Sequence, residues 1–553
     1  MSAGARVAIA TLPTGVPGLD EILGGGLPEY SFNLLAGAPG AGKTTLAHQL
    51  MFALATPARP ALYFTVVGES ALKLLRYQQQ FSFFDPAKVG VSIHFVDLTA
   101  LVQGRDLGAV LAEIVRQVAV IAPGLVVVDS FQAVAQSAGG AVRDDRMSLQ
   151  DFVQDLAVHL TGWQATTFLL GEDVDGALRG SPVFTIADGI IRLTQAVDGN
   201  SVVRKLQVLK SRGQAPMPGL HTLRIDAAGL RVYPRMSIAR AEANRDMSMA
   251  RLASGVPGLD ALLGGGVPTG DTVLISGPSG AGKSVLAAQF IAAGAADGEP
   301  GVIAVFEEHP QEYLRRAAAL GLDLPRMVER GRVEIIYIRP LDLSPDETLQ
   351  AIREAVARTG ARRVVIDSMT GFELALAPGF RADFRESLYR LVGALTGTGI
   401  TVLLTMEIMQ DARALRFSPN VISFLADTII LLRYAEAAGA LRTSLTVVKM
   451  RNSDHSRALW WYAITGGGAV VRGPVGDGGA LPDGPAGVTT REEVVLGALI
   501  ELTEATPAAL ARRVGLPETA LTPALDRLVD LAYAVRLEAA GAIVYRPVAR
   551  AAG

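Results

Sequence analysis

The sequence GAPGAGKT, from Gly37 to Thr44, and its counterpart GPSGAGKS, from Gly277 to Ser284, decide how this chain folds. Both fit the pattern G-x-x-x-x-G-K-[ST], and each follows an apolar run and precedes a stretch with helical spacing. Glycines in such a loop let backbone N–H groups turn inward around phosphate oxygens at a helix N-terminus. The two stretches therefore predict two phosphate-cradling loops (P-loops), each between a strand and a helix.

Each P-loop predicts a site for ATP with Mg²⁺. The lysine of this motif reaches the β and γ phosphates, and the hydroxyl after it ligates Mg²⁺. The candidate ATP-binding residues are Gly37, Gly40, Gly42, Lys43, Thr44 and Thr45 in the first copy and Gly277, Gly280, Gly282, Lys283 and Ser284 in the second. Thr44 and Ser284 are also candidate metal ligands.

The two loops belong to a large internal duplication. The similarity runs without a gap from Val16 to Lys43 and from Val256 to Lys283, an offset of 240 residues. Further along, LVVVDS pairs with RVVIDS, IADGIIRL with LADTIILL, and VLKSR with VVKMR. Several ordered matches at a nearly constant offset indicate two related domains.

Each copy shows the alternation of an α/β domain. Short apolar runs such as FNLLAG, ALYFTVV, LVVVDS and TTFLLGE predict buried parallel strands, and helical patterns fall between them. This alternation predicts a parallel sheet flanked by helices. We place the first domain at about 1–235 and the second at about 250–470, with a short polar connector between them.

Acidic residues at strand ends are candidates for metal binding and catalysis. Asp129 and Asp367 each close an apolar run, where a carboxylate holds the Mg²⁺ shell in P-loop enzymes. The segment VFEEHP carries Glu307 and Glu308, adjacent acids that suit a general base. The first copy has only Glu69 in FTVVGES, one position late, so either it is a displaced base or a solvated loop acid.

Two basic pairs come late in the copies: Lys210 with Arg212, and Lys449 with Arg451. Residues at alternate positions of a strand share a face. Each pair could reach the γ-phosphate of a neighbouring subunit, or could be solvated charges at a strand end.

Composition excludes several classes of site and partner. The chain has 553 residues and no cysteine, which rules out disulfides, Cys-ligated zinc and thiol nucleophiles. Its net charge of −3 gives no global attraction to nucleic acid or anionic lipid. No apolar run is long enough to span a membrane, and no secretory signal is evident, so we expect a cytoplasmic protein without a membrane partner.

These motifs together resemble the KaiC family of RecA-like ATPases. The resemblance rests on GVPGLDxxLGGGxPxG ahead of the P-loop, VFEE, VVIDS, LADTIILL and VVKMR, and it covers about residues 10–460. It implies two tandem RecA-like domains, ATP with Mg²⁺ at subunit interfaces, and a two-tiered homohexamer. By the same resemblance Glu307 and Glu308 are catalytic acids, and the pairs Lys210–Arg212 and Lys449–Arg451 contact ATP on the adjacent subunit.

One departure bears on kinase activity. The clock member of the family autophosphorylates adjacent Ser and Thr just before its TDTIILL segment. Here VISFLADTIILL offers Ser423, but Phe424 stands where the threonine would be. The dual phosphorylation site is therefore broken, and Ser423 is either a single acceptor or an ordinary structural serine.

A third unit follows a Gly/Pro-rich linker at 466–487. Residues 488–553 predict three helices and a β-hairpin, the pattern of a winged helix. The unit has eight acidic residues against seven arginines, and phosphate contacts need clustered basic side chains. This composition favours docking of a protein partner, and DNA binding is the alternative.

Three functions remain open from the sequence. The first is a hexameric regulatory ATPase that signals through bound partners. The second is a Ser/Thr autokinase of clock type, which Phe424 disfavours. The third is a DNA-acting recombinase or helicase relative, which the charge balance disfavours.

Overall fold

The structure of the chain is a computed structural model. It describes residues 9–66, 71–131, 133–134, 147–173, 182–198, 201–235, 250–338, 343–377, 380, 384–408, 425–437, 440–451, 453–475, 495, 498–499, 502, 504–514, 517–530, 534–539 and 542–547. The chain forms two compact units, one built mainly on the residues up to Ser237 and the other mainly on those from Ile238 onward.

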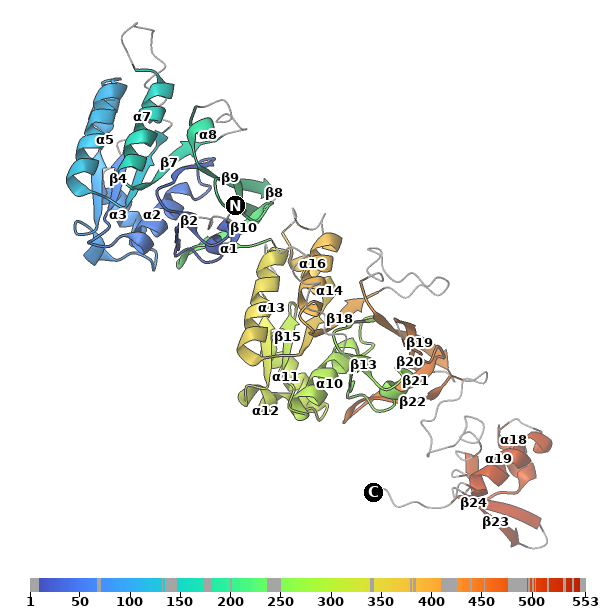
Figure 1. Cartoon of the computed structure of the whole chain (residues 1–553). Helices are drawn as coiled ribbons and strands as arrows, with labels where there is room; N and C mark the ends of the chain where they lie inside the picture. Colours follow the sequence, from blue (N-terminus) through green and yellow to red (C-terminus); the bar gives the residue numbers. More distant parts are fainter. Residues whose placement is uncertain are drawn as a thin grey trace, which may run out of the picture. The chain divides into compact units, whose positions relative to one another are not determined.

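The first domain is a nine-stranded sheet with helices on both faces (Figure 1). The strand order is β11-β10-β9-β8-β3-β7-β6-β4-β5. Its strands are β3 (Phe32–Gly37), β4 (Ala61–Thr65), β5 (Ile93–Asp97), β6 (Leu125–Asp129), β7 (Thr166–Glu172), β8 (Gly189–Asp198), β9 (Ser201–Ser211), β10 (His221–Asp226) and β11 (Gly229–Tyr233). Its helices are α1 (Leu19–Leu23), α2 (Lys43–Leu54), α3 (Ala71–Gln78), the 3₁₀ turn η1 (Pro86–Lys88), α4 (Thr99–Gln103), α5 (Leu107–Ile121), α7 (Leu149–Gly162) and α8 (Pro182–Ile186); β1 (Thr11–Leu12) and β2 (Leu27–Pro28) form a small ribbon.

The second domain repeats this plan with the order β16-β15-β17-β18-β14-β19-β20-β21-β22. Its strands are β14 (Thr272–Gly277), β15 (Gly301–Val305), β16 (Val333–Tyr337), β17 (Arg363–Asp367), β18 (Thr401–Glu407), β19 (Thr428–Ala437), β20 (Ala440–Met450), β21 (Trp460–Thr465) and β22 (Gly468–Pro474). Its helices are α9 (Leu259–Leu262), α10 (Lys283–Ala296), α11 (Pro310–Ala319), α12 (Leu324–Glu329), α13 (Pro345–Thr359), α14 (Met369–Ala375) and α16 (Phe384–Thr396); β12 (Arg251–Leu252) and β13 (Val267–Pro268) form the ribbon.

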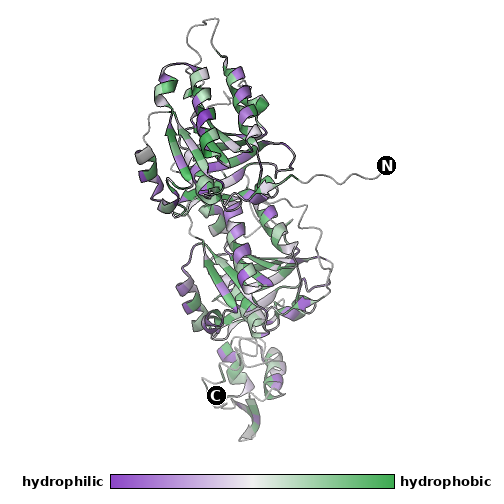
Figure 2. Cartoon of the chain, turned by 60° about the vertical axis from the view of Figure 1, so that its left-hand side comes forward, coloured by the Kyte–Doolittle hydropathy of each residue, from purple (hydrophilic) through white to green (hydrophobic). Residues whose placement is uncertain are grey.

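Two apolar layers, one on each face, hold the first sheet. Alternate strand residues such as Leu35 and Val127 pack with α2, whereas Leu34 and Val126 pack with α5 and α7. Helices α5 and α7 lie side by side over that second face (Figure 1). Figure 2 shows the strands as the most hydrophobic elements, and the flanking helices carry both kinds of residue. This is the RecA-like arrangement expected from the sequence, present twice.

Each sheet is parallel in one part and antiparallel in the other. In the first domain β8, β3, β7, β6, β4 and β5 run parallel, and β9, β10 and β11 continue as antiparallel neighbours. The sequence predicted the parallel part but not this antiparallel extension. A buried glutamine ties the extension to the P-loop helix: the Gln49 amide exchanges two hydrogen bonds with the backbone of Leu230, and Gln289 does so with Ala469.

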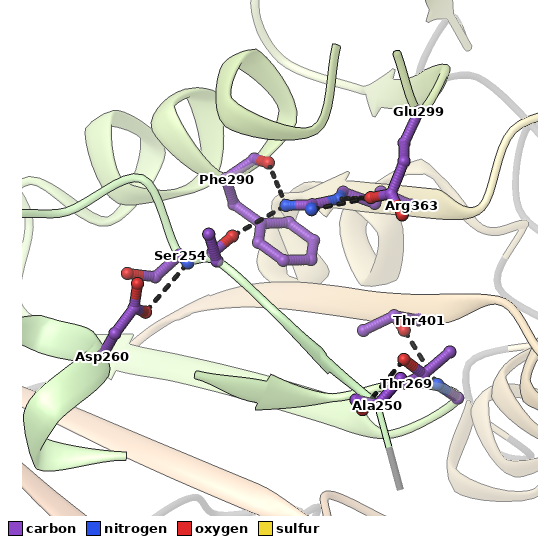
Figure 3. Close-up of polar contacts among 10 residues, drawn as sticks. Ala250, Ser254, Asp260, Thr269, Phe290, Glu299, Arg363 and Thr401 are labelled. Atoms are coloured by element: carbon purple, nitrogen blue, oxygen red, sulfur yellow. Dashed lines mark hydrogen bonds and ion pairs between the residues drawn. The ribbon is translucent and has the colours of Figure 1, made fainter. Parts of the chain in front are cut away.

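A buried arginine anchors the start of the second domain, as Figure 3 shows. Arg363, the first residue of β17, donates through Nη1 to the carbonyl oxygens of Ala253 at 2.7 Å and Phe290 at 3.0 Å. Its Nε and Nη2 donate to Oε2 of Glu299 at 2.9 and 2.7 Å. The arginine side chain is 2% exposed, and Leu125 begins the matching strand of the first domain. The network therefore joins β17 to the P-loop helix α10 in the second domain.

The end of the chain contains a separate small core. Helices α18 (Pro507–Val514) and α19 (Glu518–Asp530) pack beside the hairpin of β23 (Ala534–Ala539) and β24 (Ala542–Pro547). The sequence predicted three helices and a hairpin in 488–553, and the described residues there include α18, α19 and the hairpin. The predicted linker began too early, because residues 468–474 form β22 of the second sheet. Among the helices of the described ranges, none has the length and apolar character needed to cross a membrane.

Candidate functional site

Both P-loops join the end of a central strand to a buried helix. Helix α2 begins directly after Gly42, whose φ of 106° is a left-handed conformation that favours glycine. Gly282 has the same role before α10, with φ of 89°. At Gly37 a Cβ atom would stand 2.3 Å from the carbonyl oxygen of Leu193, so the loop can follow this path only with glycine there. The fold thus produces two open backbone cradles at helix N-termini.

The P-loop lysines lie across their own loops. Lys43 Nζ donates to the carbonyl oxygens of Gly37 at 2.8 Å and Ala38 at 3.0 Å, and Lys283 Nζ makes the matching bonds to Gly277 and Pro278. Burial lowers the pKa of both lysines, and nearby carboxylates oppose this shift. A phosphate placed in the loop would supply the negative charge that each buried ammonium needs.

Different side chains support the two loop tips. In the first domain Arg204 Nε donates to the carbonyl oxygen of Gly40 at 3.4 Å and to Gln195 at 3.1 Å. In the second domain the hydroxyl of Tyr434 donates to the carbonyl of Ser279 at 3.1 Å, and the hydroxyl of Tyr462 donates to that of Ala281. These supports were not predicted from the sequence, because they come from strands of the antiparallel part of each sheet and its border.

The carboxylates expected to hold the Mg²⁺ shell lie beside the loops. Thr44 Oγ1 donates to Oδ2 of Asp129 at 3.0 Å, and the hydroxyl of Tyr63 donates to the same oxygen at 2.5 Å. In the second domain Thr405 Oγ1 donates to Oδ1 of Asp367 at 2.6 Å. The two aspartates therefore receive hydroxyl donors from different neighbouring strands.

The acidic pair of the second domain splits into two environments. Glu307 accepts a hydrogen bond from the Ser368 hydroxyl at 3.2 Å, and its charge acts on Lys283. Glu308 forms an ion pair of 2.8 Å with Arg316. Burial raises the pKa of Glu308, and Arg316 opposes that shift. Burial is therefore the largest cause of the raised pKa of Glu308, ahead of any charge next to it.

Two further carboxylates approach the P-loop lysines. Glu172 ends β7 and Glu407 ends β18, and each opposes the effect of burial on the pKa of the nearby lysine, Lys43 or Lys283. The repeat could have revealed them, because TTFLLGE and TVLLTME both end in glutamate. Three residues singled out in the sequence, Glu69, Ser423 and Phe424, lie outside the described residues, as does the connector 236–249.

The basic pairs lie at the other end of their sheets. Lys210 is opposite Ile190 near the start of β8, and Lys449 is opposite Ile429 near the start of β19. In the first domain β8 runs parallel to β3, with Gly189 beside Asn33 and the P-loop four residues further on, about 13 Å away along the strand. Lys210 therefore does not face the P-loop of its own domain.

These basic side chains have partners at their own strand ends. Lys210 donates to the carbonyl oxygen of Thr185 at 3.0 Å, and Arg212 pairs with Asp188 at 3.0 Å while 61% of its side chain stays exposed. Lys449 and Arg451 contact Ala426 and Asp427 in the same way. Burial, and then the neighbouring arginine, lowers the pKa of each lysine.

The donor set near each P-loop fits Mg²⁺ bound with phosphate. Within the described parts of the chain, no three His, Cys, Asp or Glu side chains gather in a group that could hold a metal ion alone. Mg²⁺ in nucleotide sites usually takes one or two protein oxygens and completes its shell with phosphate oxygens and water. Thr44 with Asp129 offers such a pair of oxygens in the first domain, and Ser284 and Asp367 hold the equivalent positions in the second.

Comparisons with known proteins agree with this geometry. The family model described as "ATPase: KaiC" matches residues 12–237 and again 252–475. The chain is 29% identical over 480 residues to the circadian clock oscillator protein KaiC of Picosynechococcus sp., covering 85% of this chain and 91% of that protein. It is 28% identical over 482 residues to the protein of that name from Thermostichus vulcanus, covering 84% and 89%.

The family-model matches include both P-loops and both sheets. A third relative, the circadian clock oscillator protein KaiC 1 of Synechocystis sp., is 28% identical over 486 residues, covering 84% of this chain and 90% of that protein. The two family matches together span most of the chain and coincide with the two nine-stranded sheets. The chain belongs to the KaiC family of ATPases.

Proposed function

We propose that this chain is an ATPase in which both P-loops bind Mg·ATP and the second performs most of the hydrolysis. The observation that carries the proposal is the position of Glu307, two residues beyond the end of β15. There its negative charge opposes the effect of burial on the pKa of Lys283, the P-loop lysine. The ungapped alignment of the two copies puts Val67 at the matching position of the first domain. A site without a well-placed base binds nucleotide and turns it over slowly.

In the second site different residues bind the phosphates and accept the proton. The loop N–H groups and Lys283 hold the phosphates, and Glu307 accepts a proton from the attacking water. The water oxygen then bonds to the γ-phosphorus, the bond from that phosphorus to the bridging oxygen breaks, and ADP and phosphate leave. Mg²⁺, when bound, neutralises the negative charge of the phosphate oxygens.

We further propose that the active form is a homo-oligomer, a two-tiered hexamer. The pairs Lys210–Arg212 and Lys449–Arg451 lie at the sheet end away from their own P-loops. A basic residue of this kind can reach a γ-phosphate only if that phosphate is bound to a neighbouring copy. Binding of ATP at such an interface stabilises the assembly by mass action.

The C-terminal unit is proposed as a winged helix that docks a protein partner of a cytoplasmic assembly. The proposal is supported by the two helices that precede a hairpin and by the composition of 488–553, which has eight acidic residues against seven arginines. Binding of nucleic acid usually requires an excess of clustered basic side chains. DNA binding is the alternative, and salt-dependent binding to a DNA fragment would establish it.

Phosphate release from γ-labelled ATP tests the proposal. We expect free labelled phosphate from the wild type, a large loss for Lys283→Ala and a smaller loss per assembled chain for Lys43→Ala. Labelled phosphate retained on the protein would instead support the autokinase function. If Lys43→Ala removed most of the turnover and Lys283→Ala little, the assignment of the two sites would be reversed.

A further inference from the structure

The hydroxyl of Tyr63 connects the aromatic interior of the first domain to its candidate metal site. Tyr63 is fully buried in β4, two residues before the end of that strand. Its ring stacks on His48 with centroids 4.7 Å apart, and Phe95 packs against it at 5.4 Å. Only the hydroxyl reaches out of this aromatic group, to Oδ2 of Asp129.

The register of the sheet explains this contact. Tyr63 lies opposite Val127 in the pairing of β4 with β6, so Asp129 is two residues further along on the same face. A tyrosine is long enough to reach that position, whereas a shorter side chain at this place is not. The oxygen that accepts from Tyr63 also accepts from Thr44, the candidate Mg²⁺ ligand.

In the second domain the aspartate, Asp367, receives its hydroxyl donor from the strand on its other side, β18. Ile303 stands at the position of Tyr63 and cannot donate. Thr405 of β18 donates to Asp367 instead, from a position directly beside that aspartate in the strand register. The matching residue of the first domain is Leu170, which lies beside Asp129 and cannot donate.

We propose that Tyr63 is a positioning residue for magnesium at the first site, and that Thr405 has this role at the second. A hydrogen bond from outside the metal shell fixes the orientation of a carboxylate before the metal arrives, and losing such a bond typically weakens metal binding about 10- to 100-fold. The inference rests on the proposed function, because it assumes that the first P-loop binds Mg·ATP.

The test uses full-length protein carrying Lys283→Ala, so that a fluorescent ATP analogue reports the first site. Binding is followed while free Mg²⁺ is varied, and then while the analogue is varied at saturating Mg²⁺. We expect Tyr63→Phe to raise the Mg²⁺ midpoint about tenfold and to leave the affinity at saturating Mg²⁺ within about twofold. Mn²⁺ binding measured by electron paramagnetic resonance should weaken in parallel.

Two variants separate the hydroxyl from packing. Phe95→Leu disturbs the same aromatic group without touching the hydrogen bond and should leave the midpoint unchanged. Tyr63→Phe with Leu170→Thr supplies the donor from the strand that the second domain uses, and should restore the midpoint to within about threefold of the wild type. Thermal unfolding of each variant checks that the fold is kept.

A reciprocal experiment covers the case in which the Tyr63 variants do not fold. In a Lys43→Ala background, Thr405→Val should raise the Mg²⁺ midpoint of the second site, and Thr405→Ser should not. The proposal is overturned if folded Tyr63→Phe and Thr405→Val proteins keep the wild-type midpoint, or if Phe95→Leu shifts it as much as Tyr63→Phe. If the Lys283→Ala protein bound no analogue at any Mg²⁺ concentration, the proposed function itself would fail.

Discussion

Glu308 and Arg316 form an ion pair of 2.8 Å, while the adjacent Glu307 accepts a hydrogen bond from the hydroxyl of Ser368. Two neighbouring carboxylates of one loop therefore have different partners. The Arg316 guanidinium opposes protonation of Glu308 and orients its carboxylate toward α11, although burial raises the pKa of Glu308 overall. We therefore propose Glu307, whose charge opposes the lowering of the pKa of Lys283, as the general base, and Glu308 as the residue that ties the loop to α11.

The first prediction separates these two glutamates. Glu307→Gln should reduce phosphate release by about 10²- to 10⁴-fold, because amide oxygen cannot accept the proton of the attacking water. Glu308→Gln should cost about tenfold or less, through a less ordered loop. Single-turnover phosphate release at saturating Mg·ATP measures both variants.

Glu312→Gln is the matched control for these variants, since Glu312 lies in the first turn of α11 with 58% of its side chain exposed. It should keep the wild-type rate. A larger loss for Glu308→Gln than for Glu307→Gln would show that the roles are exchanged.

The second prediction concerns pH. Burial lowers the pKa of Lys43 and Lys283 from the ordinary value of 10.5, and bound phosphate favours the charged form and raises the pKa again. Binding of ATP should therefore take up protons, and its affinity should fall as the pH rises through the range below 10.5. Calorimetry in two buffers of different ionisation enthalpy, repeated as the pH is raised toward 10.5, measures the proton uptake; equal heats in both buffers throughout that range would contradict the prediction.

The third prediction concerns assembly. Arg212→Ala should lower the fraction of hexamer at limiting ATP without unfolding the monomer, because the guanidinium is largely exposed and its ion pair among the described residues is with the strand-end carboxylate of Asp188, at 3.0 Å. Light scattering gives the mass, and Arg116→Ala is the control, since Arg116 forms a similar exposed pair with Glu113 on α5. Hexamers of Arg212→Ala that match the wild type would exclude a role across subunits.

The fourth prediction is that the ATPase domains do not need the C-terminal unit. Removing residues 488–553 should preserve ATP binding and the ring, because the Gly/Pro-rich sequence that follows β22, residues 476–487, is of a kind that transmits little packing energy. Nucleotide binding and light scattering of the shortened chain test this. Failure to assemble would make the unit part of the ring rather than a docking module.

The fifth prediction concerns the buried arginine of the second domain. Arg363→Met should lower the free energy of unfolding of that domain by about 2–4 kcal/mol, because the carbonyl oxygens of Ala253 and Phe290 lose their charged donor. Glu299 is 27% exposed and can regain water, so most of the cost comes from the carbonyls.

Tryptophan fluorescence can follow this domain alone. The chain has three tryptophans, and in a Trp163→Phe background the signal comes from Trp460 and Trp461 of β21. Arg358→Met is the control, because its ion pair with Glu334 is exposed and its loss should not change the midpoint measurably. An Arg363→Met midpoint equal to that of the control would contradict the prediction.

The sequence was sufficient for the parallel half of each domain. Continuous apolar runs predicted β3 and β6, and the P-loop pattern placed the start of α2 within one residue. The same runs identified Asp129 and Asp367, because a carboxylate that closes a buried strand stands out against its neighbours. These signals are local, so no knowledge of strand order was needed.

The parts that depend on strand neighbours could not be predicted. Tyr63 looks like an ordinary core residue in ALYFT, and Thr405 like an ordinary strand threonine, until the order of the sheet brings them beside the aspartates. The roles of Glu69 and Ser423, which lie outside the described residues, stay predictions.

The hydroxyl donors to Asp129 and Asp367 also limit how the two halves of this duplicated chain could recombine. A crossover that gave the first domain the strand sequence of β15 in place of β4 would put isoleucine where Tyr63 stands and leave Leu170 on the other side. The reciprocal crossover would give Asp367 donors from both neighbouring strands. Replacing β4 alone therefore removes the strand donor of Asp129, and replacing β18 alone by the β7 sequence would remove that of Asp367. Exchange of both flanking strands together keeps one strand donor at each aspartate, so Tyr63 with Leu170, and Ile303 with Thr405, form matched pairs.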